Sequence, residues 1–582
     1  MRKEKDGISV HAIPGTHTVL FGMDATAQAR DGLLGFALGK RQPGGTVRWM
    51  NGFKFFRETL PDPQPGVLKP TNEHPIQDFQ WSDYNAEPGG VAADYVIRPL
   101  YGTPTDLHPG ADIEMQVETL NAPGARQQVY FNRGAVPGQA FARRFGNTYP
   151  TPEERRDPDN PKVKWLSRGL LEAALAFISR AADEAFELKV AAYEFTYFPI
   201  LLALGQAALR GARIKVCVET GDYRSNGDVY QNETSIANWQ AMLDGELKKQ
   251  LGHLLPSMSG KGLTLHPRTK WSGIPHNKFM VLKRDGEPIA LWTGSTNFTS
   301  SGFLGQANLA HVIEDAALGG MYERYWDELA ADPVFRAFKS FNTNTFPDPA
   351  PLQADAIAPV FSPREAGMLA WYAQQMQDAK SAGFLTAAFG VSETIGAAFV
   401  GPSEVLRFVL AESSGSSKKA KQTMKAIEAD PDNIVAMGAF LAEKSVVHGL
   451  PGERLDQWYL REEQHRHGHI NYIHTKLMMI DPLGPNPRIF SGSANFSASS
   501  VTSNDENMLL LSGAWANEVA PIFVNEFMRL HRHLYFRMTA LRLVGAGGAD
   551  PRKAARLEPN DSWLVDHYTP GTQKFRKREL FR

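Results

Sequence analysis

The chain has 582 residues, of which 42% are hydrophobic and 21% charged. This is the composition of an ordinary globular protein, and the length suggests about three or four domain-sized units. The formal net charge of −1 excludes a uniformly basic nucleic-acid-binding surface, although a local basic groove stays open. The one cysteine, Cys217, excludes an intramolecular disulfide framework.

Apolar runs are short along the whole chain. None approaches the ~20 residues that are needed to span a bilayer. The charged start, residues 1–7, is not followed by an apolar run of signal-peptide length. We therefore expect a soluble, cytoplasmic protein without an integral membrane segment, and export by a signal-independent route stays open.

Residues 1–150 are rich in Gly and Pro and carry short strand-like runs between turn signals. In Ile113–Val117 the apolar residues alternate, as a half-buried strand requires. About seven strands in about 130 residues predict a β-sandwich-like domain similar to immunoglobulin or fibronectin type III domains. Such a module more often binds or packs than catalyses. The Pro-rich segment 147–163 is the predicted linker that follows it.

Beyond the linker, helical and strand patterns alternate, which predicts an α/β fold with a sheet covered on both faces. A first lobe is expected over 160–345 and a second over 355–545, joined by a Pro-rich connector. The tail, 546–582, is predicted to be irregular and basic. The main predicted helices are 170–185, 201–210, 366–379, 403–411 and 516–541, and the main strands are 189–195, 213–219, 263–266, 384–389 and 433–437.

One short pattern occurs twice, once in each lobe. The first copy is Pro275-His276-Asn277-Lys278 followed by Gly294-Ser295-Thr296-Asn297; the second is Ile473-His474-Thr475-Lys476 followed by Gly492-Ser493-Ala494-Asn495. The spacing from His to Gly is 18 residues in both copies, and the two histidines lie 198 residues apart. Random matches would not share their internal spacing, so the pattern indicates an internal duplication with one site built from both halves.

The chemistry of these residues points to an anion. His and Lys two positions apart on a strand project from one face. The ammonium can bind a phosphate oxygen while the imidazole attacks or donates a proton, and the following Ser and Asn could add a hydroxyl and an amide donor. Two such copies would surround one phosphate group.

This paired pattern resembles the signature of the phospholipase D superfamily, His-x-Lys followed by Asp and then Gly-Ser-x-Asn, and the resemblance covers about residues 165–540. It implies two pseudo-twofold-related α/β lobes with mixed sheets, and cleavage of a phosphodiester through a covalent phosphohistidine, with no metal or other cofactor. It also implies one monomeric site shared by both lobes. The catalytic residues implied are His276, His474, Lys278, Lys476, Asn297, Asn495 and Glu506, and the supporting residues are Asp481, Ser295, Ser493 and Asn308.

The two copies are not equivalent. Asp481 stands where the superfamily has its Asp, but the first copy has Lys283 there. Eleven residues after each motif Asn, the second copy has Glu506 and the first has Asn308. A carboxylate fixes the tautomer of an imidazole and raises its basicity, whereas an amide orients it without adding charge. Which histidine is bonded to Glu506 stays open at this point.

Resemblance to asymmetric members such as the tyrosyl-DNA phosphodiesterases favours His276 as the nucleophile and His474 as the general acid. The overall arrangement looks most like uncharacterised bacterial members grouped with the small endonuclease of the superfamily. Phospholipid and nucleic acid are equally open as substrates, because the sequence offers neither a clear cationic path nor clear lipid-binding loops.

A different class of function is also open. A degenerate scaffold could bind a partner through its β-domain, although the intact His, Lys and Asn in both copies speak against it. The triplet His465, His467 and His469 could suggest a metal site, but its polar neighbours favour a solvated loop.

Overall fold

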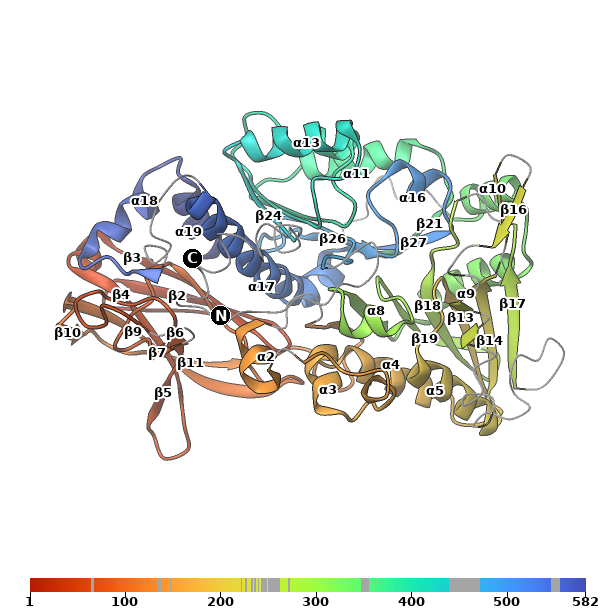
Figure 1. Cartoon of the computed structure of the whole chain (residues 1–582), viewed down its shortest axis with the longest axis horizontal. Helices are drawn as coiled ribbons and strands as arrows, with labels where there is room; N and C mark the ends of the chain where they lie inside the picture. Colours follow the sequence, from red (N-terminus) through yellow and green to blue (C-terminus); the bar gives the residue numbers. More distant parts are fainter. Residues whose placement is uncertain are drawn as a thin grey trace.

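The computed structural model (Figure 1) describes the chain except residues 64–66, 134–137, 147, 221, 226–227, 232–233, 235–236, 239, 242–248, 250–261, 271–272, 347–354, 439–471 and 546–554.

The N-terminal part forms two antiparallel sheets, as predicted. Apolar side chains of both sheets, among them Phe21 and Ile97, share one buried core. In β11 (Ile113–Glu118) the even alternation of buried and exposed residues confirms the pattern seen in the sequence. The first sheet holds β1 (Arg2–Lys5), β2 (Ile8–Pro14), β3 (Val19–Ala25) and β8 (Gln80–Asp83), and the second holds β4 (Leu33–Arg41), β5 (Val47–Trp49), β9 (Ala92–Thr103), β10 (Asp106–Pro109) and β11 (Ile113–Glu118).

The first lobe is built on a seven-stranded mixed sheet with the order β12-β20-β19-β18-β13-β14-β17. The neighbours β13, β14 and β17 run parallel, and all other neighbouring pairs are antiparallel. The bounds are β12 (Gln127–Phe131), β13 (Phe186–Ala192), β14 (Arg213–Glu219), β17 (Leu263–Arg268), β18 (Lys278–Arg284), β19 (Glu287–Gly294) and β20 (Leu309–Ile313).

The second lobe repeats this sheet strand for strand, in the order β21-β27-β26-β25-β22-β23-β24. Here β22, β23 and β24 are the parallel neighbours, in the same places as in the first lobe. The shared order and direction confirm the duplication and the two-lobed α/β fold. The bounds are β21 (Ile357–Ser362), β22 (Ala382–Ala387), β23 (Leu406–Ala411), β24 (Asn433–Met437), β25 (Leu477–Ile480), β26 (Arg488–Gly492) and β27 (Glu506–Ser512).

Helices cover both faces of each sheet. On the outer faces, α4 (Leu170–Ser179) and α5 (Phe198–Leu209) pack on the first lobe, and α11 (Gly367–Gln377), α12 (Glu393–Gly396) and α13 (Lys418–Ala429) pack on the second. Between the lobes lie α9 (Ala316–Ala330) and the long helix α17 (Gly513–Gly545), whose apolar residues join one core with strands of both sheets (Figure 1). The lobes are therefore packed as one body.

Two expectations about boundaries and elements need correction. Strand β12 lies within the predicted N-terminal domain 1–150, yet it pairs with β20 of the first lobe, so the lobe begins before residue 150. The predicted helix 403–411 is instead strand β23, with all six residues from Leu406 to Ala411 buried. A strand covered on both faces is a continuous apolar run, and periodicity does not distinguish such a run from a buried helix.

From residue 555 onward the tail is folded rather than irregular. Its last part forms α18 (Val565–Tyr568) and α19 (Gln573–Phe581), and Phe581 is fully buried where α19 packs on β3. Basic side chains of α19 form ion pairs: Lys577 with Asp78 and Arg578 with Asp24. The helix was missed because its apolar residues contact strands that are distant in the sequence. These cationic side chains of α19 therefore form ion pairs within the folded chain.

Candidate active site

The two motifs meet where the lobes face each other. His276 lies just before β18, and its backbone N–H donates to the carbonyl of Asp505 in the second lobe (2.8 Å). His474 lies before β25, and its N–H donates to the carbonyl of Ala307 in the first lobe (3.1 Å). Each histidine is thus attached to the strand start of the opposite lobe. The two imidazole rings lie with their centroids 6.3 Å apart.

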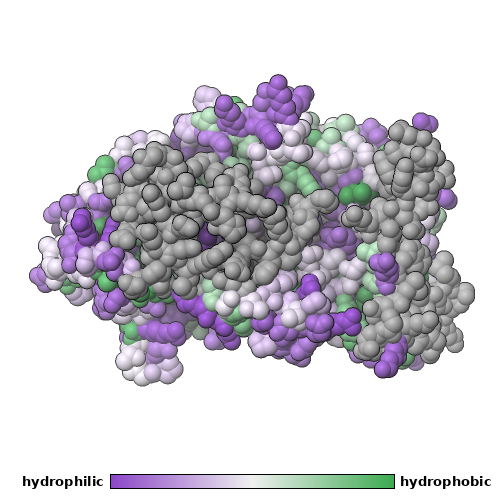
Figure 2. Space-filling view, in the orientation of Figure 1, coloured by the Kyte–Doolittle hydropathy of each residue, from purple (hydrophilic) through white to green (hydrophobic). Residues whose placement is uncertain are grey.

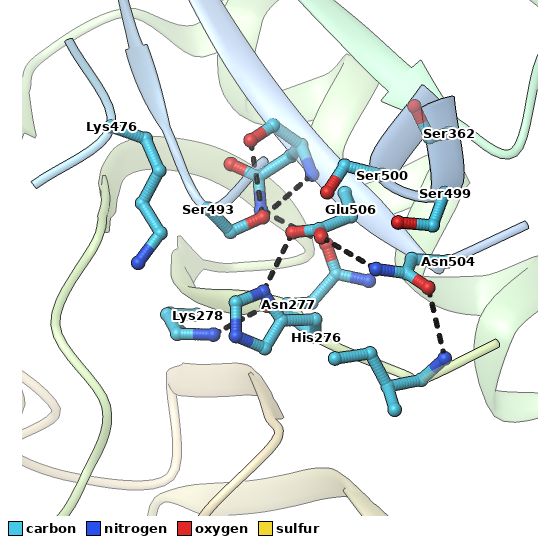
Figure 3. Close-up of polar contacts among 12 residues, drawn as sticks. His276, Asn277, Lys278, Ser362, Lys476, Ser493, Ser499, Ser500, Asn504 and Glu506 are labelled. Carbon is cyan, nitrogen blue, oxygen red and sulfur yellow. Dashed lines mark hydrogen bonds and ion pairs between the residues drawn. The ribbon is translucent and has the colours of Figure 1, made fainter. Parts of the chain in front are cut away.

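The side chain of each histidine also forms a hydrogen bond with a residue of the opposite lobe. His276 Nδ1 lies 2.9 Å from a carboxylate oxygen of Glu506, and His474 Nδ1 lies 2.8 Å from the amide oxygen of Asn308. Both partners are acceptors, so each Nδ1 carries the proton and donates it, and each Nε2 is left for chemistry. Figure 3 shows the His276 ring between Glu506 and the lysines. The partner of Glu506 is therefore the histidine of the other motif copy.

Further polar contacts hold these two partners in place. Asn504 donates to the second carboxylate oxygen of Glu506 (3.1 Å) and accepts from the backbone N–H of Ile274 (3.1 Å; Figure 3). On the other side, Ser295 donates to the amide oxygen of Asn308 (2.9 Å), whose amide N–H donates to the carbonyl of Gly302. The orientation of the Asn308 oxygen toward His474 is therefore determined by its neighbours.

The motif serines do not present their hydroxyl protons to a ligand, as the sequence suggested they could. Ser295 donates to Asn308, and Ser493 donates to the backbone carbonyl of Asn507 while accepting from its N–H. A hydroxyl has one proton to donate. Both serines therefore stabilise the strand starts that carry the partners of the histidines.

The two lysines lie beside the histidines and are buried. Lys278 donates to the carbonyl of His276, and Lys476 donates to the carbonyl of His474, each over 2.6 Å. An ammonium has three N–H groups, so each lysine keeps donors for an anion after this contact. Two ammonium groups in one buried site form a strong anion-binding position.

Burial shifts the pKa values of the whole cluster. It lowers the pKa of both histidines well below the usual range, and the nearby charges of Lys278 and Lys476 lower them further. Burial also lowers the pKa of Lys278 to about 7, against the attraction of the carboxylates. The pKa of Glu506 rises to about 7, again because of burial. Both imidazoles are therefore neutral before an anion binds.

The motif asparagines differ in their surroundings. Asn297 donates a hydrogen bond to the carboxylate of Glu194, which follows β13. Asn495 lines a cavity of about 300 Å³ in the second lobe, together with Phe389 and Ile395. Asp481 lies at the other end of β25, where its carboxylate accepts backbone N–H groups at the start of β22. Its contacts are structural, as a supporting role implies.

Glu194 is the residue that the motif pattern did not predict. Residues 193–195 end the strand predicted over 189–195, and from sequence such an end can equally point at the site or be buried. In the structure the ring of Tyr193 lies edge-on to His276, with centroids 5.0 Å apart, while Glu194 holds Asn297. The signal that could have found Glu194 is its position two residues after the end of a strand that is adjacent to the motif strand.

Among the described residues, no cluster of three or more His, Cys, Asp or Glu is arranged to hold a metal ion. The triplet His465, His467 and His469 lies outside the residues that the structure describes. A search of the described helices for a stretch long and apolar enough to cross a bilayer finds none.

A family model described as cardiolipin synthase, PLD-like domain, matches residues 175–330 and 446–531. The two matched segments contain both copies of the His-x-Lys motif. Together with the duplicated sheet and the paired site, this match supports membership of the chain in the phospholipase D superfamily. No curated protein matches the sequence significantly.

Several solved structures match parts of this chain at low similarity. A phosphatidylserine synthase from Haemophilus influenzae Rd KW20 is 12% identical, with 63% of this chain and 85% of that chain covered at a TM-score of 0.42. The phospholipase D family member Nuc from Salmonella typhimurium is 21% identical. The match covers 35% of this chain and 94% of Nuc, with a TM-score of 0.21. A polyphosphate kinase from Porphyromonas gingivalis is 11% identical, with a TM-score of 0.36. The match covers 63% of this chain and 48% of the kinase.

Proposed function

We propose that the chain is a phosphodiesterase that cleaves a phosphodiester of a phospholipid or a nucleic acid through a covalent phosphohistidine, without a metal ion. The observation that supports this most strongly is the crossed pair of contacts, His276 with Glu506 and His474 with Asn308. Two imidazoles whose Nδ1 protons are engaged have their Nε2 atoms available at one anion site. One chain supplies both halves of the site, so we propose that a monomer is sufficient.

His276 is the proposed nucleophile because its partner is a carboxylate. The Nε2 lone pair attacks phosphorus, a P–N bond forms, and the bond from phosphorus to the leaving oxygen breaks. Positive charge develops on the His276 ring in this step, and the Glu506 carboxylate stabilises it across 2.9 Å. A neutral amide at the same place would offer a dipole instead of a charge.

His474 is the proposed general acid in this first step. Its lowered pKa leaves it neutral in the empty site, because burial and two lysine charges oppose its protonation. A bound phosphodiester anion offsets the lysine charges, so His474 gains its proton when substrate binds. It then gives the Nε2 proton to the leaving oxygen, and the neutral Asn308 amide does not hold that proton back.

The second step reverses these roles. His474, now neutral, takes a proton from a water molecule, whose oxygen attacks phosphorus while the P–N bond to His276 breaks. The products are a phosphate monoester and the free enzyme. Throughout, Lys278 and Lys476 stabilise the charge on the phosphoryl oxygens that do not react.

The substrate class stays a matter for experiment, because each candidate has a feature in its favour. The cavity beside Asn495 is lined by apolar residues such as Phe389, Val391 and Ile395, which suits an apolar group of a lipid or a base. Next to it, α13 carries the exposed lysines Lys418, Lys419, Lys421 and Lys425, and Figure 2 shows this part of the surface, at the top of the view, as strongly hydrophilic. Cationic side chains of this kind suit a nucleic-acid backbone.

The test uses bis(p-nitrophenyl) phosphate, whose leaving group needs no acid. In EDTA, wild type should turn over continuously, whereas His474→Ala should release about one equivalent of p-nitrophenol and then stall, because water lacks its base. His276→Ala should give no release. Mass spectrometry of peptides from alkali-quenched His474→Ala should find the phosphoryl group on His276.

The exposed residue His108 offers a matched control, since His108→Ala removes an imidazole far from the motifs in the sequence and should behave as wild type. A phosphoryl group on His474 would reverse the two roles. Loss of turnover in EDTA would contradict the metal-free step. If wild type cleaves neither this ester nor DNA, RNA or phosphatidylcholine, the chain is a binding scaffold.

A further inference from the structure

Glu194 places an additional carboxylate at the site, and the reaction proposed above does not use it. It lies two residues after the end of β13, is partly buried, and accepts a hydrogen bond from the motif amide of Asn297. The electrostatic field of its carboxylate reaches both Lys278 and Lys476. Burial raises its pKa, and the two lysines act in the opposite direction.

The charged groups that face one another here form a small set. Among the described residues, each lysine is attracted by the same two carboxylates, Glu506 and Glu194, and each carboxylate by the same two lysines. With all four ionised, the cations and carboxylates balance before a ligand binds. Without Glu194 the site would carry one net positive charge.

The fold itself does not require a carboxylate at this position. Val190 of β13 pairs with the residue four positions after His276, and Leu385 of β22 pairs with the equivalent residue of the second copy. Four positions further along, the corresponding residues are Glu194 and Phe389. Phe389 is 57% exposed and lines the cavity. The equivalent strand end of the second lobe thus carries an apolar residue. We therefore look for a functional reason for the charge of Glu194.

On the basis of the proposed function, we propose that Glu194 is a specificity-determining residue that makes the site prefer a monoanionic phosphodiester over a dianionic phosphomonoester. A diester brings one negative charge to a site whose cations are already balanced, and a monoester brings two. The Coulomb repulsion between Glu194 and the ligand is proportional to the charge of the ligand, so the monoester is disfavoured more.

The same repulsion acts on the product. Cleavage of a diester yields a monoester, whose second ionisation has a pKa of about 6. The product therefore acquires a second negative charge near neutral pH, and Glu194 weakens its binding at the moment when it has to leave. A site with two lysines and one carboxylate would retain this product more tightly.

The test compares two probes in the full-length protein at pH 7, with binding measured by calorimetry. Diphenyl phosphate is monoanionic and phenyl phosphate is dianionic. Glu194→Gln keeps an acceptor for Asn297 but removes the charge, so affinity should rise by about tenfold for diphenyl phosphate and, as the square of that factor, about a hundredfold for phenyl phosphate. Because each probe is compared with itself across variants, its size cancels.

Two further variants separate charge from contact. Glu194→Asp keeps the charge but shortens the reach to Asn297, so the preference between the probes should stay close to that of wild type. Glu314→Gln removes a half-exposed carboxylate that pairs with Arg180 at the end of the first lobe's sheet, and it should change neither affinity. Equal gains for both probes in Glu194→Gln, or no gain, would overturn the proposal.

His276→Ala is added to each protein in the binding experiment, so that diphenyl phosphate is bound but not cleaved and the two proposals fail separately. If no diester is cleaved but Glu194→Gln changes the two affinities unequally, the phosphodiesterase is wrong and the charge selection stands. If diesters are cleaved and the two probes respond alike, the phosphodiesterase stands and Glu194 serves only to position Asn297.

Discussion

At the scale of single residues, the site is asymmetric because its two histidines have different hydrogen-bond partners. His276 and His474 have the same surroundings of burial and positive charge, yet one donates to a carboxylate and the other to an amide. The carboxylate favours a ring that becomes positively charged in the reaction. The amide favours a ring that has to release a proton.

The pKa values around His276 predict a narrow pH profile. Glu506 has to be ionised and has a raised pKa of about 7, so kcat/KM should rise with pH through about 7. Lys278 has to be protonated and has a lowered pKa of about 7, so kcat/KM should fall as pH increases beyond that point. The measurement is the pH dependence of kcat/KM on a diester, which reports groups of the free enzyme, and its maximum should lie near pH 7.

Two variants assign the limbs of this profile. Glu506→Gln should lower kcat/KM by about 10²-fold or more and abolish the acidic limb, because no carboxylate remains to ionise. Lys278→Met should shift the alkaline limb, because only Lys476, whose pKa burial also lowers, then remains to lose its proton. The neighbouring carboxylate Glu194 shifts the midpoints but does not replace the acidic limb. An acidic limb that persists in Glu506→Gln would assign it to another group.

At the scale of elements, the strand starts position the chemistry. Glu506 is the first residue of β27, and Asn308 directly precedes β20, the strand in the same place of the other sheet. The segments before the two histidines pair with these strand starts across the lobe boundary: Pro275 forms a β-bridge with Asp505, and Ile473 forms one with Ala307. Exchange of partners between the lobes is therefore a property of the duplicated sheet.

Helix α19 is an element whose packing can be tested directly. Phe581 is fully buried between β3 of the N-terminal domain and β23 of the second lobe. Phe581→Ala should lower the free energy of unfolding by about 3–5 kcal/mol, because a large buried side chain is lost and leaves a cavity. Urea denaturation measures the change. Lys574→Ala, which removes an exposed ion pair on the same helix, should cost less than about 1 kcal/mol.

At the scale of the whole molecule, α17 joins the parts that carry the site. It contacts strands of both lobes and β2 of the N-terminal domain. Within it, the buried carboxylate of Glu526 pairs with Arg168 of the first lobe over 2.6 Å and with Arg529 over 2.8 Å. Burial alone would raise the pKa of Glu526, but the two arginines outweigh it and lower the pKa to about 2.

This pair predicts how stability depends on pH. The folded pKa of Glu526 lies below the unfolded value of about 4.3, so its stabilisation is complete above about pH 5 and is lost as pH falls toward 2. Glu526→Gln should lower the free energy of unfolding by about 3–5 kcal/mol at pH 7, because Arg168 is left without its charge partner. The difference from wild type should shrink in acid.

The control for this prediction lies on the same helix. Glu518 forms a half-exposed pair with Arg126, so Glu518→Gln should cost less than about 1 kcal/mol at every pH. The urea midpoint of the three proteins between pH 2 and 7 is the measurement. A gap between Glu526→Gln and wild type that stays constant with pH would mean that the pair does not contribute through its charge.

The sequence by itself determined the duplication, the α/β class, the resemblance to the phospholipase D superfamily and the inequivalence of the two motif copies, because these depend on spacing and residue type. Tertiary structure decided which partner each histidine has, since Glu506 lies 230 residues from His276 and either lobe could have supplied it. It also placed Glu194 beside Asn297 and turned the serines inward. These side-chain contacts depend on burial and on which distant segments meet in the fold, and the local sequence pattern contains no information about either.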